Sequence, residues 1–570
     1  MNVLGFFTFR GAHNSSAAIV CNGKLVAAAE EERFSRRKHD GSIPLSAIEF
    51  CLAEAGLRFR DIDLIAFPDT PFRTGPDSAH AAVETELLKE LRAAGRVSGA
   101  SLLHKRALDA WLHAGLPLPN LGMNPIVAAG LALVRERFGK LPPLRFVDHH
   151  KAHAAAAFFT SGLDSAAVAT IDGRGGNYAT AIWHARGKDL KRIAGEPYCN
   201  SLGLFYEDCS EYLGLGRLNP GKTMGLAPYG HPDILADAVS HLLSTRDGRL
   251  YRYRRPPNED LIGFPRRTSE PVNTPPFTHF AAASQNALET AVRKIAVAAL
   301  ELTGESALCL GGGTAYNCTS NGTLRESAVG SPLWIFPAAG DAGLSVGAAL
   351  FSAAERGDDC GERLPHAFWG PDYNAAECEA ALQDEPDLAM ERRDDGTAHA
   401  ASLLAHGEIL GWFAGRMELG PRALGNRSIL ADPRSIAIRD RVNDIKGRER
   451  WRPLAPAVLA SRADEFFDIA DASEFMLFAT RVRASKQSLV RGIVHVDGSA
   501  RPQTVTRTQN PLLHDLIAQF ERLTGVPMLI NTSFNDAAEP IVCSPRDAVS
   551  TFKRTALDAL VMGQLVVRRR

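Results

Sequence analysis

The sequence predicts an α/β protein whose N-terminal part contains two related halves and whose C-terminal part is a smaller α/β domain. Three apolar, β-prone runs occupy residues 3–30, and residues 166–193 repeat the same strand–turn–strand–turn–strand pattern. Residues 355–373 are rich in glycine, proline and charge and have no periodicity, which is typical of a linker. The sequence therefore predicts two domains, 1–358 and 373–570, each long enough for its own core.

The elements of the two halves follow from their turn residues. Asn22 and Gly23 separate two apolar runs, and an Asn-Gly pair predicts a hairpin because both turn residues take positive φ. Glycine-rich turns separate the three strands expected within 166–193. Between the halves, residues 79–95 have the pattern of a helix.

Later stretches of the sequence predict further strands and helices of both domains. Residues 307–322 read as strand, glycine-rich turn and helix, and residues 334–354 read as strand, turn and a helix of small residues. In the C-terminal part, strands expected at 407–415 and 526–534 alternate with helices such as 512–525. This alternation is typical of an α/β or α+β domain.

Charge and cysteine content exclude several classes of function. Lys and Arg number 64 against 65 acidic residues, and this balance argues against nucleic-acid or membrane-surface partners, which require excess positive charge. The nine cysteines are scattered without a C-x-x-C pair, which favours reduced thiols. No secretory signal is visible, and no 18 apolar residues run together. We therefore expect a cytoplasmic protein without a membrane partner.

The string "VDHHKAHAAAAFF" at 147–159 raises the question of a metal site. If it is helical with Asp148 as N-cap, His149 and His153 share one face, and two imidazoles one turn apart can reach one ion. The alternative is a helix start whose histidines are solvated or hydrogen-bonded. Asp341, in a turn before the small-residue helix, is the candidate third ligand. Two histidines and one carboxylate suit Fe(II), with Mn(II) or Zn(II) possible.

Two glycine-rich runs are candidate nucleotide loops. In "GGG" at 311–313 and "DGRGG" at 172–176, backbone N–H groups can face a phosphate or an adenosine, although such runs are equally often plain tight turns. His13 lies in the first hairpin loop and is a candidate general base, since the pKa of an unperturbed imidazole is about 6.5.

Residues 416–452 carry nine Arg and one Lys against five acidic residues. One interpretation is a solvated face with ion pairs. However, glycines and prolines between the charges indicate a shaped loop, and residues 530–535 ("INTSFN") add a polar turn at a strand end. Guanidinium groups bind phosphate and carboxylate through paired hydrogen bonds, so this region predicts a site for a small, multiply charged anion.

Taken in order along the whole chain, these stretches resemble the O-carbamoyltransferases of antibiotic and nodulation-factor biosynthesis. Among the strings that carry the resemblance are "GAHNSSAAIV", "DHHKAHAAAAFF", "TIDGRGG", "NPGKTMGLAPYG", "LGGGTAYN", "GRMELGPRALGNRSILADPR", "ARPQTV" and "NTSFN". Within the family, the chain is most similar to members that carbamoylate aminoglycosides such as tobramycin.

The resemblance implies an actin-like (ASKHA-type) N-terminal domain that transfers a carbamoyl group with the help of a metal, and a YrdC-like C-terminal domain. The C-terminal domain would convert carbamoyl phosphate and ATP, supplied with Mg(II), into carbamoyladenylate. The N-terminal domain would then pass the carbamoyl group to a hydroxyl of a polyhydroxylated small molecule and release AMP. An aminoglycoside is a polycation, so acidic residues within 29–34 or 231–285 are candidates for its pocket.

The same resemblance implies a role for individual residues. It makes His149, His153 and Asp341 the metal ligands, with Fe(II) as the expected ion. His13 and Lys38 would act in catalysis, and the nucleotide would contact Asp172, Gly173, Gly311, Gly312, Gly313 and Asn317. Carbamoyl phosphate and ATP would be held by Arg416, Arg422, Lys446, Arg450, Arg452, Arg501, Ser533 and Asn535.

Three other functions remain open at this stage. An actin-like sugar kinase usually carries an Asp-Gly loop in both hairpins, whereas the first loop here reads "RGAHN". A fused tRNA threonylcarbamoyl-type transferase would need an extended basic face, which a nearly neutral chain does not suggest. A nucleotide-switched chaperone or scaffold would not need an arginine-rich second domain.

Overall fold

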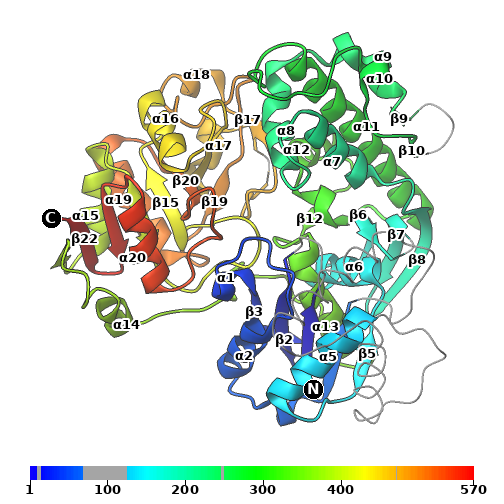
Figure 1. Ribbon diagram of the computed structural model, residues 1–570, viewed down its shortest axis with the longest axis horizontal. Helices are drawn as coiled ribbons and strands as arrows, with labels where there is room; N and C mark the ends of the chain where they lie inside the picture. The colour runs from blue at the N-terminus through cyan, green and yellow to red at the C-terminus, as the bar shows by residue number, and fades with distance from the viewer. Residues whose placement is uncertain (9–13, 69–124, 177, 246–249, 470) are drawn as a thin grey trace. The chain divides into compact units, whose positions relative to one another are not determined.

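The computed structural model describes the chain except residues 9–13, 69–124, 177, 246–249 and 470 (Figure 1). His13 and the helix predicted at 79–95 therefore lie outside the described residues. The chain divides into two compact units, each built from several segments. Unit 1 comprises Met1–Tyr198, Thr303–Gly313 and Trp334–Leu364, and unit 2 comprises Cys199–Leu302, Thr314–Leu333 and Pro365–Arg570.

The first sheet has the strand order β3-β2-β1-β4-β5. Its first three strands are antiparallel neighbours, whereas β4 runs parallel to β1 and β5 runs parallel to β4. Asn22 and Gly23 both have positive φ in the β2–β3 turn, which confirms the predicted hairpin. The strands are β1 (Asn2–Phe7), β2 (Ser16–Cys21), β3 (Lys24–Glu30), β4 (Leu64–Phe67) and β5 (Leu144–Phe146).

The second sheet repeats this plan in the order β12-β11-β6-β7-β8. Strands β6, β7 and β8 are antiparallel neighbours, and β11 runs parallel to β6 as β4 does to β1. The predicted internal repeat is therefore confirmed. The strands are β6 (Ser165–Gly175), β7 (Tyr178–Arg186), β8 (Asp189–Pro197), β11 (Leu308–Gly311) and β12 (Leu333–Ile335).

Helix α13 (Leu344–Glu355) packs against α6 (His149–Phe159), β1 and β2. Its small residues make this packing possible. A Cβ added at Gly347 would lie 1.9 Å from the carbonyl oxygen of Ala152, and a Cβ added at Gly5 would lie 2.0 Å from that of Ser345. The predicted small-residue helix is thus confirmed. The other helices of unit 1 are α1 (Glu32–Ser35), α2 (Leu45–Glu54) and α5 (Pro125–Phe138).

Unit 2 begins with a helical region in which the 27-residue helix α11 (Phe277–Thr303) is the longest element. One face of α11 is apolar and buried, as the 3.6-residue periodicity of its alanines, leucine and isoleucine requires. The other helices here are α7 (Leu202–Tyr212), α8 (Pro220–Leu226), α9 (Ala236–Ser240), α10 (Glu259–Ile262) and α12 (Cys318–Glu326), and the short strands are β9 (Leu243–Ser244) and β10 (Arg252–Tyr253).

The C-terminal part of unit 2 is built on a mixed sheet with the order β13-β22-β21-β14-β15-β20-β16-β19. Parallel pairs such as β14 with β21 occur beside antiparallel pairs such as β14 with β15. The strands are β13 (Leu388–Arg392), β14 (Leu410–Phe413), β15 (Arg427–Ala431), β16 (Ala455–Leu459), β19 (Gln503–Val505), β20 (Met528–Ser533), β21 (Ala559–Met562) and β22 (Leu565–Arg569). The main helices are α14 (Ala375–Ala380), α15 (Gly396–Ala405), α16 (Ile436–Ile445), α19 (Pro511–Thr524) and α20 (Pro545–Arg554).

This sheet has an apolar core of its own. Buried side chains from Cys378 to Val567, including Trp412 and Phe534, form one contiguous cluster. The predicted α/β fold class, with two related N-terminal sheets followed by a C-terminal α/β region, is confirmed. The functional division into 1–358 and 373–570 stays a prediction, because residues Cys199–Leu302 cluster with the C-terminal part rather than with the two repeated sheets.

The nine cysteines all lie in the described part of the chain, and none of them forms a disulfide. Across the described segments, we find no helix with both the length and the apolar character that a bilayer crossing requires.

Candidate metal centre and anion site

Helix α6 begins at His149 because Asp148 caps it. The Asp148 carboxylate accepts a hydrogen bond from the backbone N–H of Lys151 at 2.9 Å. The helix then places His149 and His153 one turn apart on the same face, and both side chains are buried. The predicted helix and its N-cap are therefore confirmed.

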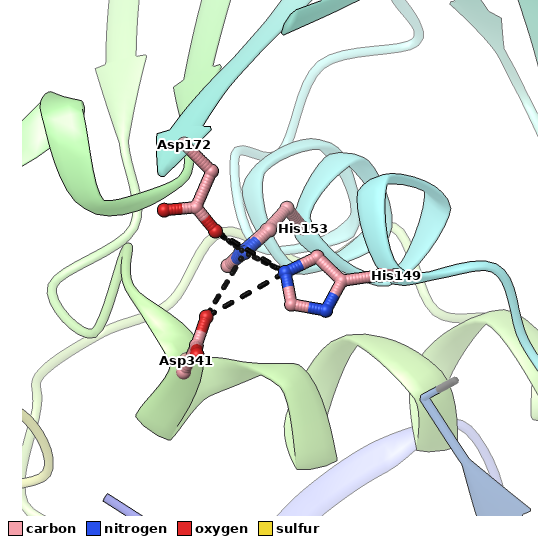
Figure 2. Close-up of side chains that lie close together, drawn as sticks. All are labelled: His149, His153, Asp172 and Asp341. Carbon is pink, nitrogen blue, oxygen red and sulfur yellow. Dashed lines mark hydrogen bonds and ion pairs between the residues drawn. The ribbon is translucent and has the colours of Figure 1, made fainter. Parts of the chain in front are cut away.

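Two carboxylates from distant parts of the sequence converge on these two imidazoles (Figure 2). The Nε2 atoms of the two histidines lie 3.1 Å apart. Asp172 Oδ2 lies 3.2 and 3.1 Å from the Nε2 atoms of His149 and His153, respectively. Asp341 Oδ1 lies 3.6 and 3.5 Å from the same two atoms. The four side chains His149, His153, Asp172 and Asp341 are called the quartet below.

The spacing within the quartet fits one shared ion. Two donors that each lie about 2.1 Å from an ion are about 3.0 Å apart at a right angle and about 3.4 Å apart at a tetrahedral angle. The five measured separations, from 3.1 to 3.6 Å, fall close to this range. Two imidazoles and two carboxylates suit Fe(II), Mn(II) or Zn(II). Metal binding itself stays a prediction.

The electrostatics of the quartet also favour a cation. Burial by itself lowers the pKa of His153, but hydrogen bonds and charge interactions with Asp172 and Asp341 outweigh it and raise the pKa to about 9. Burial would raise the pKa of Asp172, yet its bonds to His149 and His153 hold this pKa well below its usual range. Positive charge on the histidines thus stabilises the charged form of Asp172, and a metal ion bound at the quartet would supply the same charge.

The third histidine of the motif, His150, has a different role. Its Nε2 donates to the carbonyl oxygen of Tyr178 at 2.9 Å, and its Nδ1 lies 2.8 Å from the hydroxyl of Thr170. Burial first, and then the neighbouring histidines, lower the pKa of His150 to about 4. It is thus a neutral side chain that fastens α6 to strands β6 and β7.

Asp172 lies in the quartet, a position that the sequence did not predict. Its expected contact with a nucleotide stays a prediction. Its Oδ1 atom accepts hydrogen bonds from the backbone N–H groups of Gly173 at 2.8 Å and Gly313 at 3.1 Å. The signal that pointed to it is its place near the end of β6, directly before a glycine-rich turn.

The glycine run 311–313 packs against the quartet. Gly312 has a φ of +87° and donates its N–H to the carbonyl oxygen of Ala339 at 2.8 Å. A Cβ at Gly311 would lie 3.0 Å from the carbonyl oxygen of His153. Nucleotide contact by this run and by Gly173 stays a prediction. Asn317 belongs to unit 2, where it caps α12 and shares paired hydrogen bonds of 3.0 Å with Gln285.

A cluster of arginines forms in unit 2. Burial first and then the charge of Arg501 lower the pKa of Arg422 to about 9, and burial and the charge of Arg452 do the same for Arg448. Burial also lowers the pKa of Arg452. Among the described residues, the Nε of Arg422 is buried without a hydrogen-bond partner. These four side chains, Arg422, Arg448, Arg452 and Arg501, are called the arginine cluster below.

Three members of this cluster, Arg422, Arg452 and Arg501, were predicted from the sequence, whereas Arg448 was not. Arg448 sits close to the polar turn, with Nη1 3.4 Å from the Thr532 hydroxyl. Arg450, which we expected in the site, is exposed and pairs with Asp444 at 2.7 Å. Arg416 donates to the carbonyl oxygens of Gly370 and Trp369 at 3.2 and 3.1 Å. Neighbouring arginines on one loop are not distinguishable by spacing alone.

Lys446, Ser533 and Asn535 are brought together as predicted. The ammonium of Lys446 is buried and donates to the Asn535 carbonyl and side-chain oxygens at 2.8 and 3.0 Å, and its Nζ lies 3.3 Å from Ser533 Oγ. Lys446 thus holds the polar turn after β20 in place. Contact of these three groups with a substrate stays a prediction.

Lys38 and the acidic residues within 29–34 are the other candidate site residues of unit 1. Lys38 lies in an exposed turn after α1, and its role in catalysis stays a prediction. The acidic residues within 29–34 are buried: Glu31 accepts from the backbone N–H groups of Ser46 and Ala47 at the start of α2, and Arg33 pairs with Glu30 and Glu32. These carboxylates stabilise α1 and α2.

Comparisons with known proteins assign the chain to a family. Residues 2–350 match the carbamoyltransferase N-terminus, and residues 401–569 match the carbamoyltransferase C-terminus. The nodulation protein NolNO of Sinorhizobium fredii is 39% identical over 98% of this chain and 79% of its own length. The nodulation protein NolO of Bradyrhizobium diazoefficiens is 42% identical over 74% of this chain and 79% of its own length.

Among solved structures, full-length HypF in its phosphate- and nucleotide-bound form is 14% identical, covers 63% of this chain and 47% of its own, and has a TM-score of 0.33, which is too low to carry an argument. The two matched regions and the identity to NolNO assign the family without this structural similarity. The chain belongs to the carbamoyltransferase family, and it is a transferase enzyme.

Proposed function

We propose that this carbamoyltransferase acts in two steps on two sites. In the first step, water splits carbamoyl phosphate into carbamate and phosphate, and a carbamate oxygen then attacks the α-phosphorus of ATP to give carbamoyladenylate and pyrophosphate. In the second step, a hydroxyl group of the acceptor attacks the carbamoyl carbonyl, a carbamate ester forms, and AMP leaves with the electron pair of the broken C–O bond.

The arginine cluster supports the first step and is the observation that carries the proposal. Carbamoyl phosphate and the ATP triphosphate are both multiply charged, and Mg(II) would accompany ATP. Burial first, and then neighbouring guanidinium charge, lower the pKa of Arg422, Arg448 and Arg452, so these groups are costly to assemble unless an anion binds between them. The buried Nε of Arg422 is a donor that an anion oxygen would satisfy.

The quartet supports the second step. A bound Fe(II), Mn(II) or Zn(II) ion would act as a Lewis acid toward the carbamoyl carbonyl. His149, His153, Asp172 and Asp341 would hold this ion, and Gly173 and Gly313 would orient Asp172 through their N–H groups. Helix α6 keeps the two imidazoles fixed before the substrate arrives, because its N-terminus is capped and its histidines are buried.

We infer an aminoglycoside, such as tobramycin, as the acceptor. The resemblance along the whole chain supports it, whereas the acidic residues within 29–34 give little support because their carboxylates are buried and hold α1 and α2. The names of the relatives favour a second acceptor class. NolNO and NolO are nodulation proteins, so an oligosaccharide nodulation factor is the alternative.

One assay tests the whole proposal. The protein is incubated with carbamoyl phosphate, Mg-ATP and a panel of aminoglycosides, cephalosporins and oligosaccharides. We expect AMP, pyrophosphate and an acceptor whose mass has risen by one carbamoyl group. ADP as the main product would instead indicate a sugar kinase, and modification of tRNA would indicate a threonylcarbamoyl-type transferase.

A further inference from the structure

Within unit 2, a segment far upstream contacts the loop that carries Arg448 and Arg452. Lys222, on α8, places its Nζ 2.9 Å from Oε1 of Glu449. Seven residues later, the hydroxyl of Tyr229 donates to the carbonyl oxygen of Trp451 at 3.0 Å. The segment 220–229 is therefore attached to the arginine loop at two points.

Glu449 is the one carboxylate on this loop between Arg448 and Arg452 in the sequence. Its two oxygens face two cations at different distances. Oε1 lies 2.9 Å from Lys222 Nζ, which is a hydrogen-bonded ion pair, whereas Oε2 lies 3.8 Å from Arg452 Nη1, which is too far for a hydrogen bond. Glu449 thus contacts Lys222 closely and Arg452 loosely.

A carboxylate beside an arginine cluster competes with any anionic substrate for the same guanidinium groups. The charge on Glu449 is always present, whereas the substrate must bind from solution. A partner that holds Glu449 away from Arg452 would remove this competition without removing the carboxylate.

We propose that Lys222 is a positioning residue of the anion site: by binding Glu449 it keeps this carboxylate from closing onto Arg452 and leaves the Arg452 guanidinium available to carbamoyl phosphate. This inference rests on the proposed function of the arginine cluster. The charges agree with it, since burial would raise the pKa of Glu449, yet its bond to Lys222 keeps the pKa below the ordinary value.

The physical consequence of losing Lys222 follows from the distances. Without the ammonium, Glu449 is a half-buried carboxylate whose Oε2 lies 3.8 Å from Arg452 Nη1, and a small side-chain rotation would bring these two atoms within hydrogen-bond distance. The substrate must then break that bond before it binds. Removing the negative charge of Glu449 at the same time should therefore restore the affinity for the substrate.

The test is a double-mutant cycle in the full-length protein. Lys222→Met, Glu449→Gln and the double variant are compared by calorimetric Kd for carbamoyl phosphate and, separately, for inorganic pyrophosphate. We expect Lys222→Met to weaken binding about five- to tenfold, or about 1–1.4 kcal/mol, which is the contribution of about one ordinary hydrogen bond. Glu449→Gln should bind at least as tightly as wild type, and the double variant should return to within about twofold of wild type.

Two further variants serve as controls. Lys222→Arg keeps the positive charge and should bind like wild type, which remains informative if Lys222→Met folds poorly. Lys553→Met removes a different Lys–Glu pair of unit 2, whose partner Glu385 lies 2.5 Å away, and should leave both Kd values unchanged.

The outcomes separate this inference from the proposed function. A Lys222→Met protein that binds normally, or a double variant as weak as Lys222→Met, would overturn the positioning role and would indicate a merely structural contact. A wild-type protein that binds pyrophosphate but not carbamoyl phosphate would instead refute the proposed substrate, while the rescue pattern measured with pyrophosphate would still test Lys222.

Discussion

At the scale of single residues, Asp172 uses its two oxygen atoms for different purposes. Oδ1 accepts two backbone N–H groups, from Gly173 and Gly313, while Oδ2 faces His149 and His153. The backbone bonds orient the carboxylate, and this orientation leaves its second oxygen directed at the site of the expected ion. Such outer hydrogen bonds tune metal affinity in many proteins.

Asp172→Asn should weaken metal binding while preserving the fold. The amide oxygen can still accept from Gly173 and Gly313, but the negative charge at the quartet is lost. We expect Fe(II) or Zn(II) affinity to fall by about 10- to 100-fold or more. Competition with a chromogenic chelator measures this affinity, and Asp341→Asn is the matched variant. Unchanged affinity in Asp172→Asn would exclude Asp172 as a ligand.

Arg448 and Arg450 provide a comparison of two arginines on one loop. Arg448→Ala should weaken carbamoyl phosphate binding by about tenfold or more, since a charge-assisted hydrogen bond contributes about 1.5–3 kcal/mol. Arg450→Ala should change the Kd by less than about twofold, because its guanidinium is exposed and paired with Asp444. Equal effects in calorimetric titrations of the two variants would contradict the arginine cluster as defined here.

At the scale of elements, the close approach of α13 to α6 sets the geometry of the quartet. Asp341 opens the short helix Asp341–Gly343 that leads into α13, and both histidines lie on α6. Gly347 lets the two helices meet at Ala152, where any larger side chain would collide with the backbone. The separation of α6 and α13 therefore determines how far Asp341 lies from the two histidines.

Gly347→Ala should destabilise the protein and loosen the quartet together. The added Cβ would lie 1.9 Å from the Ala152 carbonyl oxygen, so the helices must separate, at a cost of about 1–3 kcal/mol. Urea unfolding and metal affinity should both decrease. Gly221→Ala is the control, because its Cβ meets nothing within 4 Å and φ there is ordinary. A Gly347→Ala protein as stable as wild type would contradict this packing argument.

At the scale of the whole molecule, the two proposed reactions fall in different compact units. The quartet belongs to unit 1, which holds the first sheet and most of the second, whereas the arginine cluster belongs to unit 2. The two steps also need different chemical environments. One step needs positive charge around phosphates, and the other needs an electrophile beside a hydroxyl group.

Removal of the transition metal should therefore separate the two steps. After treatment with a chelator that spares Mg(II), we expect carbamoylation of the acceptor to stop while carbamoyl-phosphate-dependent release of pyrophosphate continues. Coupled phosphate assays and mass spectrometry of the acceptor measure the two activities, and added Fe(II) should restore transfer. If pyrophosphate release stopped as well, the assignment of the metal to the second step alone would be wrong.

Much of the local structure was predictable from the sequence because it depends on neighbours along the chain. The Asn22-Gly23 turn follows from backbone sterics, and the cap at Asp148 and the shared face of His149 and His153 follow from helix geometry. The pairing of these histidines with Asp341 was expected from its turn before a small-residue helix and from family resemblance, and the structure brings the three together.

Only the tertiary structure decided which other side chains join these sites. The arrangement of two strands and a glycine loop places Asp172 beside the histidines, and the conformation of one loop directs Arg448 into the cluster and Arg450 to solvent. Arg448 and Arg450 lie two positions apart and have the same charge and length, so composition cannot predict which of them joins the arginine cluster. Packing and hydrogen bonds such as that of Arg448 with Thr532 separate them, because these contacts exist only once the sheet has assembled.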